Sequence, residues 1–263
     1  MQLQFISVFS DFDNNILGNV SAVILLENNI SDEEMQKIAS DLNQPATTFL
    51  KSIDQENYSV RWFAPDAEIG LCGHGSLAAT AFLCEKNHLQ KIKLYKDENE
   101  IIGIKNSDGT YQMSLDAIEV NERIEVPQEV KDGFGVEILE LWKSDNKYIA
   151  LVNDEKTLQN IQPKFDTLRK SEIFGYAVTA KGDKCDFVSR TFVPHVQQLE
   201  DHATGSSHAV LVPFWANKLK NNKLKALQLS RRGGSFQCEL KNNLVNLKGE
   251  VRFLTGITSL QVD

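Results

Sequence analysis

Residues 58–83, with the sequence YSVRWFAPDAEIGLCGHGSLAATAFL, decide the fold. The segment predicts a strand that ends at Pro65, a short connection, a small-residue turn over residues 72–76, and then a helix rich in Ala and Leu. Glycine gives the turn backbone freedom, and Ser76 can cap the helix. The first N–H groups of such a helix bind anions, because they lack intrahelical partners and the helix dipole is positive there. A small carboxylate is therefore the expected ligand.

The same plan returns about half a chain later. The pentapeptide RWFAP at residues 61–65 corresponds to RTFVP at residues 190–194, and Gly75-Ser76 correspond to Gly205-Ser206 if one residue is inserted. A repeat of this length predicts two similar halves, residues 1–118 and 119–263. If the halves are related by a pseudo-twofold axis, their helix starts can face one cleft, and clefts between domains are common ligand sites.

Local patterns predict further elements. Ser31 and Glu34 form a capping box, which places a helix from Asp32 towards Leu42. Residues 138–142 and 147–152 predict a hairpin across residues 144–146, and short helices are expected over residues 155–161 and 165–170.

Composition excludes several classes of function. The net charge is −8, and the Lys and Arg residues are dispersed, which argues against a nucleic-acid partner. No run of about 18 apolar residues predicts a membrane span, and no basic leader precedes the first strand, so we expect a cytoplasmic protein. The cysteines lack metal-ligand spacing. Cys84, Cys185 and Cys238 are interpreted as buried apolar residues.

Five motifs in order resemble the phenazine-biosynthesis isomerase (PhzF-like) family, which is structurally akin to diaminopimelate epimerase. The motifs are Gly18-Asn19, DLNQPATTFL, FAPDAEIGLCGHGSLAATAFL, LEDHATGSSHAVLV and SRRGG, and they span essentially the whole chain. The resemblance implies an α/β (α+β) protein of two domains, each a barrel-like sheet around a central helix. It also implies cofactor-free proton transfer on a small carboxylate in an interdomain cleft.

The resemblance assigns roles to particular residues. His74 helps to position the substrate, Asp201 belongs to the polar site, and Gly205 and Ser206 help to hold the substrate. The sequence departs from the family at the catalytic acid or base: the family has Glu in a Ser-Glu-Thr-x-Phe segment, where this chain has Ala46. It also has His202 where the family usually has Pro.

The candidate acid and base groups are His74, Asp201 and His202, since each can carry a proton near neutral pH if its environment is suitable. The alternatives are a histidine that satisfies a turn, an acid that offsets a helix dipole, and a surface histidine. Cys72 is a candidate thiolate, although packing is the favoured interpretation. The candidate substrate-binding residues are Gly18, Asn19, Gly73, Gly75, Ser76, Gly205 and Ser206.

Two hypotheses follow for the function. The first is an isomerase or epimerase-like enzyme that needs no cofactor or metal and acts on a small carboxylate. The second is a ligand-binding protein of the same fold that has lost catalysis, because Ala46 cannot move a proton. Some relatives form dimers, which favours a homodimer.

Overall fold

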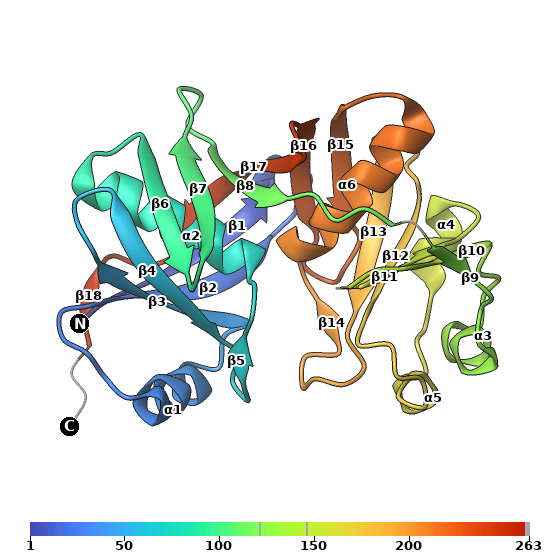
Figure 1. Ribbon diagram of the computed structural model, residues 1–263, viewed down its shortest axis with the longest axis horizontal. Coiled ribbons are helices and arrows are strands. Elements are labelled where there is room, and N and C mark those ends of the chain that lie inside the picture. Colours follow the sequence, from blue (N-terminus) through green and yellow to red (C-terminus); the bar gives the residue numbers. More distant parts are fainter. Residues whose placement is uncertain (121, 146, 261–263) are drawn as a thin grey trace. The chain divides into compact units, whose positions relative to one another are not determined.

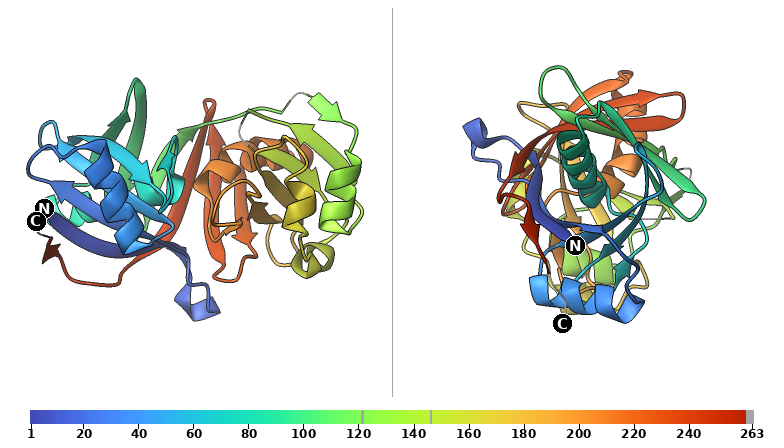
Figure 2. Two further views of the ribbon diagram at one scale, coloured as in Figure 1. Left: turned by 90° about the horizontal axis from the view of Figure 1, so that it is seen from below. Right: turned by 90° about the vertical axis from the view of Figure 1, so that its left-hand side faces the viewer.

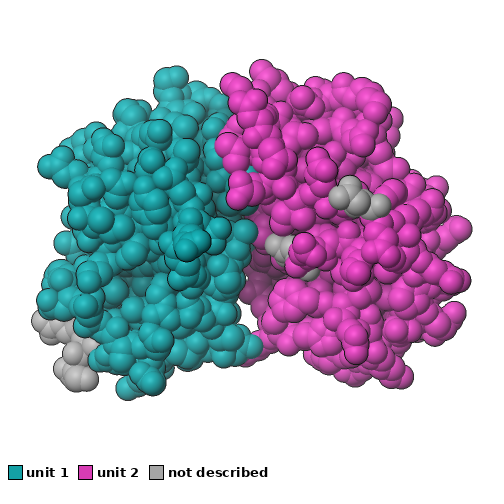
Figure 3. Space-filling model, in the orientation of Figure 1, with its two compact units in different colours: residues 1–115, 247–263 teal, residues 116–246 magenta. Residues whose placement is uncertain are grey.

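The chain divides into two compact units in the computed structural model, which describes residues 1–120, 122–145 and 147–260. Unit 1 comprises Met1–Leu115 and Leu247–Asp263, and unit 2 comprises Asp116–Asn246 (Figure 3). The sequence-based domain boundary between residues 118 and 119 stays a prediction, because a compact unit need not be a separately folding domain.

Unit 1 is a closed β-barrel. Strand β2 lies between β1 (antiparallel) and β3 (parallel), and the ladder continues through β4, β6, β7 and β8. Strand β17 pairs with both β8 and β1 and so closes the ring (Figure 1). The strands are β1 (Gln2–Ser10), β2 (Asn19–Leu26), β3 (Ala46–Ser52), β4 (Asn57–Phe63), β5 (Glu68–Ile69), β6 (Lys91–Lys96), β7 (Asn99–Lys105), β8 (Tyr111–Asp116), β17 (Leu244–Phe253) and β18 (Thr258–Ser259).

Helix α2 (Gly73–Asn87) is enclosed by this barrel, as the right-hand view of Figure 2 shows. It packs on β1, β2, β3, β6 and β7, and every residue from Gly73 to Cys84 is buried. A helix that is buried on all sides must be apolar on all sides, which explains the LAATAFL composition. Helix α1 (Asp32–Leu42) covers the outside of the sheet and packs Met35 and Ile38 against Phe49 and Phe63.

Unit 2 repeats the order of unit 1. Strand β11 is parallel to β12, β12 is antiparallel to β13, and β13 is parallel to β15, as in β2, β3, β4 and β6. Helix α6 (Gly205–Leu219) takes the place of α2. The other elements are β9 (Glu122–Ile124), α3 (Gln128–Phe134), β10 (Glu140–Lys143), β11 (Tyr148–Leu151), α4 (Glu155–Asn160), α5 (Phe165–Leu168), β12 (Tyr176–Lys181), β13 (Phe187–Phe192), β14 (Glu200–Asp201), β15 (Lys223–Gln228) and β16 (Gly234–Lys241), while unit 1 also contains the 3-10 helix η1 (Phe12–Asn14).

These findings confirm the predicted fold class, a mixed α+β protein built around barrel-like sheets. The capping box is present, since Ser31 Oγ accepts from Glu34 N–H and the Glu34 carboxylate accepts from Ser31 N–H. Strands β10 and β11 form the predicted antiparallel pair, although residue 146 of their connection lies outside the described residues. Among the described residues, no helix is long and apolar enough to cross a membrane.

The alignment of the two repeats was wrong by two residues at the helices. Helix α2 begins at Gly73 and α6 at Gly205, so the structural counterpart of Gly205-Ser206 is Gly73-His74 and not Gly75-Ser76. The error arises in the connection after the strand. Residues 64–67 join β4 to β5, whereas residues 193–199, a longer segment, join β13 to β14.

Candidate functional site

The start of α2 is capped by a cysteine. Cys72 is the N-cap residue, and its Sγ accepts a hydrogen bond from Gly75 N–H at 3.4 Å. Ser76, the predicted cap, lies in the first helical turn instead, and its Oγ donates to Cys72 O at 2.7 Å. A sulfur at this position lies at the positive end of the helix dipole, where negative charge is stabilised.

His74 lies beside this cysteine. Its side chain is 5% exposed, and its Nδ1 is 3.4 Å from Cys72 Sγ. The contact restrains the imidazole at the helix start, next to the first N–H groups of α2. His74 is therefore a buried imidazole that is held in one place at the helix start.

Gly75 allows α2 to approach the sheet closely. A Cβ at this position would lie 2.6 Å from Thr48 Oγ1 and 2.7 Å from Trp62 Cδ1, both closer than van der Waals contact allows. Trp62 is fully buried, and its Nε1 has no hydrogen-bond partner. The structure thus gives Gly75 a packing role, and its predicted role in substrate binding stays a prediction.

Ala46 is the first residue of β3 and is fully buried. Its carbonyl accepts a hydrogen bond from Ser21 Oγ at 3.1 Å, and the same hydroxyl is 2.8 Å from Thr48 Oγ1. Ala46 and Thr48 lie on the same face of β3, because side chains alternate along a strand. This position carries hydroxyl neighbours and no ionisable side chain of its own.

Gly18 and Asn19 lie where β2 begins. Gly18 has a φ of +68°, and a Cβ there would lie 2.2 Å from Val8 O, so the position requires glycine. The Asn19 side chain is fully buried, and its Oδ1 accepts from Val20 N–H at 3.1 Å. The structure therefore gives both residues a local role, and their assignment to substrate binding is still a prediction.

In unit 2, Glu200 and Asp201 form the short strand β14. The Glu200 carboxylate receives two hydrogen bonds from the Arg190 guanidinium, at 2.7 and 2.9 Å. Unit 1 has the same pair, since Arg61 donates to Glu68 at 3.0 and 2.8 Å. Glu200 is therefore a structural acid that ties β14 to β13, while Asp201 follows it at the entrance to α6.

Asp201 is held by the turn that leads into α6. Thr204 Oγ1 donates to Asp201 Oδ2 at 2.7 Å, and the Gln228 side-chain amide donates to Asp201 O at 2.7 Å. Neither Thr204 nor Gln228 belonged to the candidate residues. The Thr lies in the recognisable DHATGS motif, but Gln228 is far away in sequence and carries no motif signal.

His202 is half-buried. Its carbonyl accepts a hydrogen bond from Ser230 Oγ at 2.6 Å, and its Nδ1 is buried without a partner. Burial lowers the pKa of His202, and the neighbouring Asp201 carboxylate partly opposes this effect. The ring is thus biased towards its neutral form, which can accept a proton.

Lys147 is a third residue that was not among the candidates from the sequence. It is 7% exposed, and its Nζ lies 3.1 Å from Ser206 Oγ in the first turn of α6. A buried ammonium beside the positive end of a helix makes this region favourable for an anion. The only signal in the sequence is a single cation directly before the apolar segment at residues 148–152.

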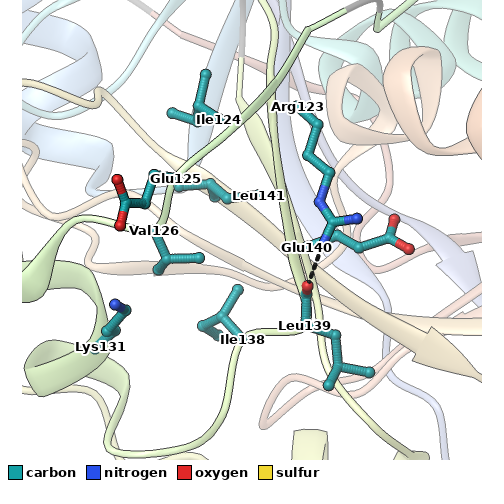
Figure 4. A pocket seen from close by; sticks show the side chains of 9 residues that line it. All are labelled: Arg123, Ile124, Glu125, Val126, Lys131, Ile138, Leu139, Glu140 and Leu141. Carbon is teal, nitrogen blue, oxygen red and sulfur yellow. Dashed lines mark hydrogen bonds between the residues drawn. The ribbon is translucent and has the colours of Figure 1, made fainter.

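The structure brings Asp201, His202, Gly205 and Ser206 together in unit 2, and Cys72, Gly73, His74, Gly75 and Ser76 together in unit 1. An open pocket of about 480 Å³ lies elsewhere in unit 2, between β9, α3 and β10 (Figure 4). None of the candidate site residues lines it, and its apolar lining residues are Ile124, Val126, Ile138, Leu139 and Leu141.

The family model described as "Phenazine biosynthesis-like protein" (PhzC-PhzF) matches residues 6–256. The chain belongs to the phenazine biosynthesis-like family. An uncharacterized isomerase of Halalkalibacterium halodurans is 34% identical over 238 residues, which cover 89% of each chain. The crystal structure of a putative phenazine biosynthesis PhzC/PhzF protein from Clostridium difficile is 34% identical, covers 100% of both chains and superposes with a TM-score of 0.88.

More distant structures share the fold alone. A probable proline racemase from Agrobacterium radiobacter is 12% identical and superposes with a TM-score of 0.69 over 100% of this chain and 93% of its own. Membership of the phenazine biosynthesis-like family and the isomerase relatives support a general isomerase or epimerase role.

Proposed function

We propose that this protein is a cofactor-independent isomerase that moves a proton on a small carboxylate substrate. One observation carries the proposal: the start of α6 has a buried lysine amino group against its first turn and an oriented carboxylate just before it. Lys147 Nζ contacts Ser206 at the start of α6, and Asp201 enters the same helix four residues earlier. An anion-binding element and a group that can take a proton are thus built into one turn.

The helix starts supply the binding energy. At the start of α6, the Thr204 side chain makes no cap hydrogen bond to the helix, so a ligand carboxylate can accept from the first N–H groups and from Lys147. We propose that the start of α2, with Gly73 and His74, faces the same substrate across a cleft between the units. Gly73-His74 and Gly205-Ser206 then play equivalent parts.

The chemistry needs two groups. Asp201 takes a proton from a substrate carbon, and the electron pair of the broken C–H bond stays on the substrate as a delocalised carbanion. Lys147 and the helix dipoles stabilise this charge. His74 returns a proton at another position or face, or His202 does so after it has taken up a proton from the solvent, and the solvent restores the starting protonation states. No redox partner is needed.

The second candidate is a binding protein without turnover, which is favoured by Ala46 at the position where the family resemblance places the catalytic Glu. That position lies on the barrel-facing side of β3 with hydroxyl neighbours, and it lacks the carboxylate that the family resemblance places there. A carboxylate could still be held by the two helix starts, because their N–H groups do not depend on residue 46.

Solvent-deuterium incorporation distinguishes the two candidates. The wild type, Asp201→Asn and Ala46→Glu are incubated in heavy water with small carboxylates, including amino acids and a dihydro-hydroxyanthranilate, and exchange is followed by NMR. We expect the wild type to label one compound and Asp201→Asn to label it at least about 100-fold more slowly, as for loss of a general base. Labelling by Ala46→Glu alone, with binding by the wild type, supports the binding protein.

A further inference from the structure

The turn before α6 uses its capping hydroxyl for something other than capping. Thr204 is the N-cap residue, yet its side chain makes no hydrogen bond to the helix. Its Oγ1 instead donates to Asp201 Oδ2 at 2.7 Å. A capping Thr normally stabilises its helix by about 1 kcal/mol. The N-cap residue of α2 does cap its helix, since Cys72 Sγ accepts from Gly75 N–H.

Gln228 fixes the direction of that hydroxyl. It is the last residue of β15 and is 1% exposed. Its Nε2 donates to Thr204 Oγ1 at 3.0 Å and to Asp201 O at 2.7 Å, and its Oε1 accepts from Thr204 N–H at 2.8 Å. The amide faces two acceptors with its nitrogen and one donor with its oxygen, so only one orientation satisfies all three bonds.

The order of these bonds leaves the Thr204 hydroxyl one choice. Because its oxygen accepts from Gln228, its single proton is directed to Asp201 Oδ2. Hydrogen bonds in such a chain strengthen one another, and here Thr204 and Gln228 are buried while Asp201 is partly buried. The result is a carboxylate whose backbone and side chain are both held by residues outside β14.

We propose that Thr204 and Gln228 are positioning residues that set the side-chain rotamer of Asp201 for proton transfer. The inference rests on the proposed role of Asp201. Proton transfer needs the carboxylate oxygen within hydrogen-bond reach of the substrate proton, and a misplacement of about 1 Å can cost about 100-fold in rate. The two residues act through Asp201 and need no contact with the substrate.

The first test measures the rotamer directly and needs no substrate. Three-bond couplings from Asp201 Cγ to its backbone nitrogen and carbonyl carbon report the χ1 populations in the labelled protein. We expect one dominant rotamer in the wild type and in Thr204→Ser, which keeps the hydroxyl. Thr204→Val keeps the shape but loses the hydroxyl, and Gln228→Glu loses both donated bonds. We expect both to show averaged couplings, and unchanged couplings in both would overturn the proposal.

The second test is a double-mutant cycle on deuterium exchange with the dihydro-hydroxyanthranilate and amino-acid panel. We expect Thr204→Val to lower kcat about 10- to 100-fold with little change in KM, and Thr204→Ser to restore it. In the Asp201→Asn background, Thr204→Val should have no further effect. An additional loss there contradicts a role through Asp201. Full exchange by Asp201→Asn alone overturns the proposed function and leaves the rotamer result to decide the positioning role.

Discussion

Ile69 and Asp201 occupy equivalent positions in the two units. Each follows a Glu that is paired with an Arg on the preceding long strand, and each pairs across the ladder with the residue after that Arg. Unit 1 therefore has an apolar side chain where unit 2 has an ionisable one. The repeat supplies the scaffold twice, but this acid is present in only one half.

Lys147 is the first residue to test. We expect Lys147→Met to weaken binding of a panel carboxylate about 10- to 100-fold, since a hydrogen bond to a charged group contributes about 1.5–3 kcal/mol. Lys220→Met is the matched control, because Lys220 lies at the opposite end of α6 and is exposed. Titration calorimetry measures both. Equal affinities in the two variants would remove Lys147 from the proposed site.

His208 gives the stability a pH dependence. It is fully buried, its Nδ1 lies 2.8 Å from Thr204 O, and its ring stacks on Phe236 with centroids 3.8 Å apart. Burial lowers the pKa of His208 from 6.5 to about 4. Between pH 6.5 and pH 4, His208 therefore binds a proton in the unfolded chain but stays neutral in the folded protein. Stability is fully present above pH 6.5 and is lost as the pH falls towards 4, by about 3 kcal/mol in total.

Urea unfolding between pH 7 and pH 4.5 checks this prediction. His208→Gln should flatten the dependence of the unfolding free energy on pH, whereas His88→Asn, at the exposed C-cap of α2, should leave it unchanged. Imidazole NMR of the wild type gives an independent reading, and a His208 signal that titrates near pH 6.5 would contradict the assignment.

At the scale of elements, α2 and α6 have similar backbone caps but differ in how side chains cap their first turns. Both are buried helices of 15 residues with a β-region N-cap and an αL C-cap. The first turn of α2 is closed by Cys72 and Ser76, while the cap residue of α6 is directed to Asp201. The first backbone N–H groups of α6 thus receive no hydrogen bond from the cap side chain, whereas those of α2 do.

A substitution at Gly75 tests how closely α2 packs against the sheet. Gly75→Ala should destabilise the protein by about 1–3 kcal/mol, because the new methyl group overlaps Thr48 and Trp62. Gly70→Ala is the control, since a Cβ at Gly70 has no neighbour within 4 Å and should change stability by less than about 0.5 kcal/mol. Thermal unfolding compares the two. Equal melting temperatures would mean that the barrel relaxes around the methyl group.

The sequence predicted the elements well because their signals are local. The capping box at Ser31, the strand before Pro65 and the buried helix after it depend on neighbouring residues alone. The register of the repeat could not be predicted, because the connection at residues 193–199 differs in length from that at residues 64–67 and carries no pattern. Gln228 and Lys147 could not be assigned either, since strand pairing and not spacing brings them to α6.

At the scale of the whole molecule, the fold of unit 1 depends on the path of the chain, which leaves this unit and later returns to it. The chain leaves unit 1 after Leu115, forms unit 2, and returns at Leu247. Strand β17 begins in unit 2 and ends in unit 1, where it pairs with β1 over Ile6↔Phe253 to Ser10↔Glu250. The barrel of unit 1 therefore depends on residues that follow all of unit 2.

Truncation tests this dependence. A chain that stops after residue 246 should be insoluble or unfolded, because β1 and β8 lose the strand that joins them. A chain that stops after residue 256 loses β18 and the partly buried Leu260 but keeps β17, so it should remain folded. Soluble yield and circular dichroism distinguish the two. A folded product from the shorter chain would show that β17 is dispensable.

The returning strand also sets an order of events during translation. The ribosome releases β1 first, but that strand cannot find its last neighbour until residues 247–253 have been synthesised. Unit 2 has by then been synthesised completely. Nascent unit 1 must therefore remain an open, edge-exposing sheet for most of synthesis, which is the period in which chaperones would protect it from aggregation.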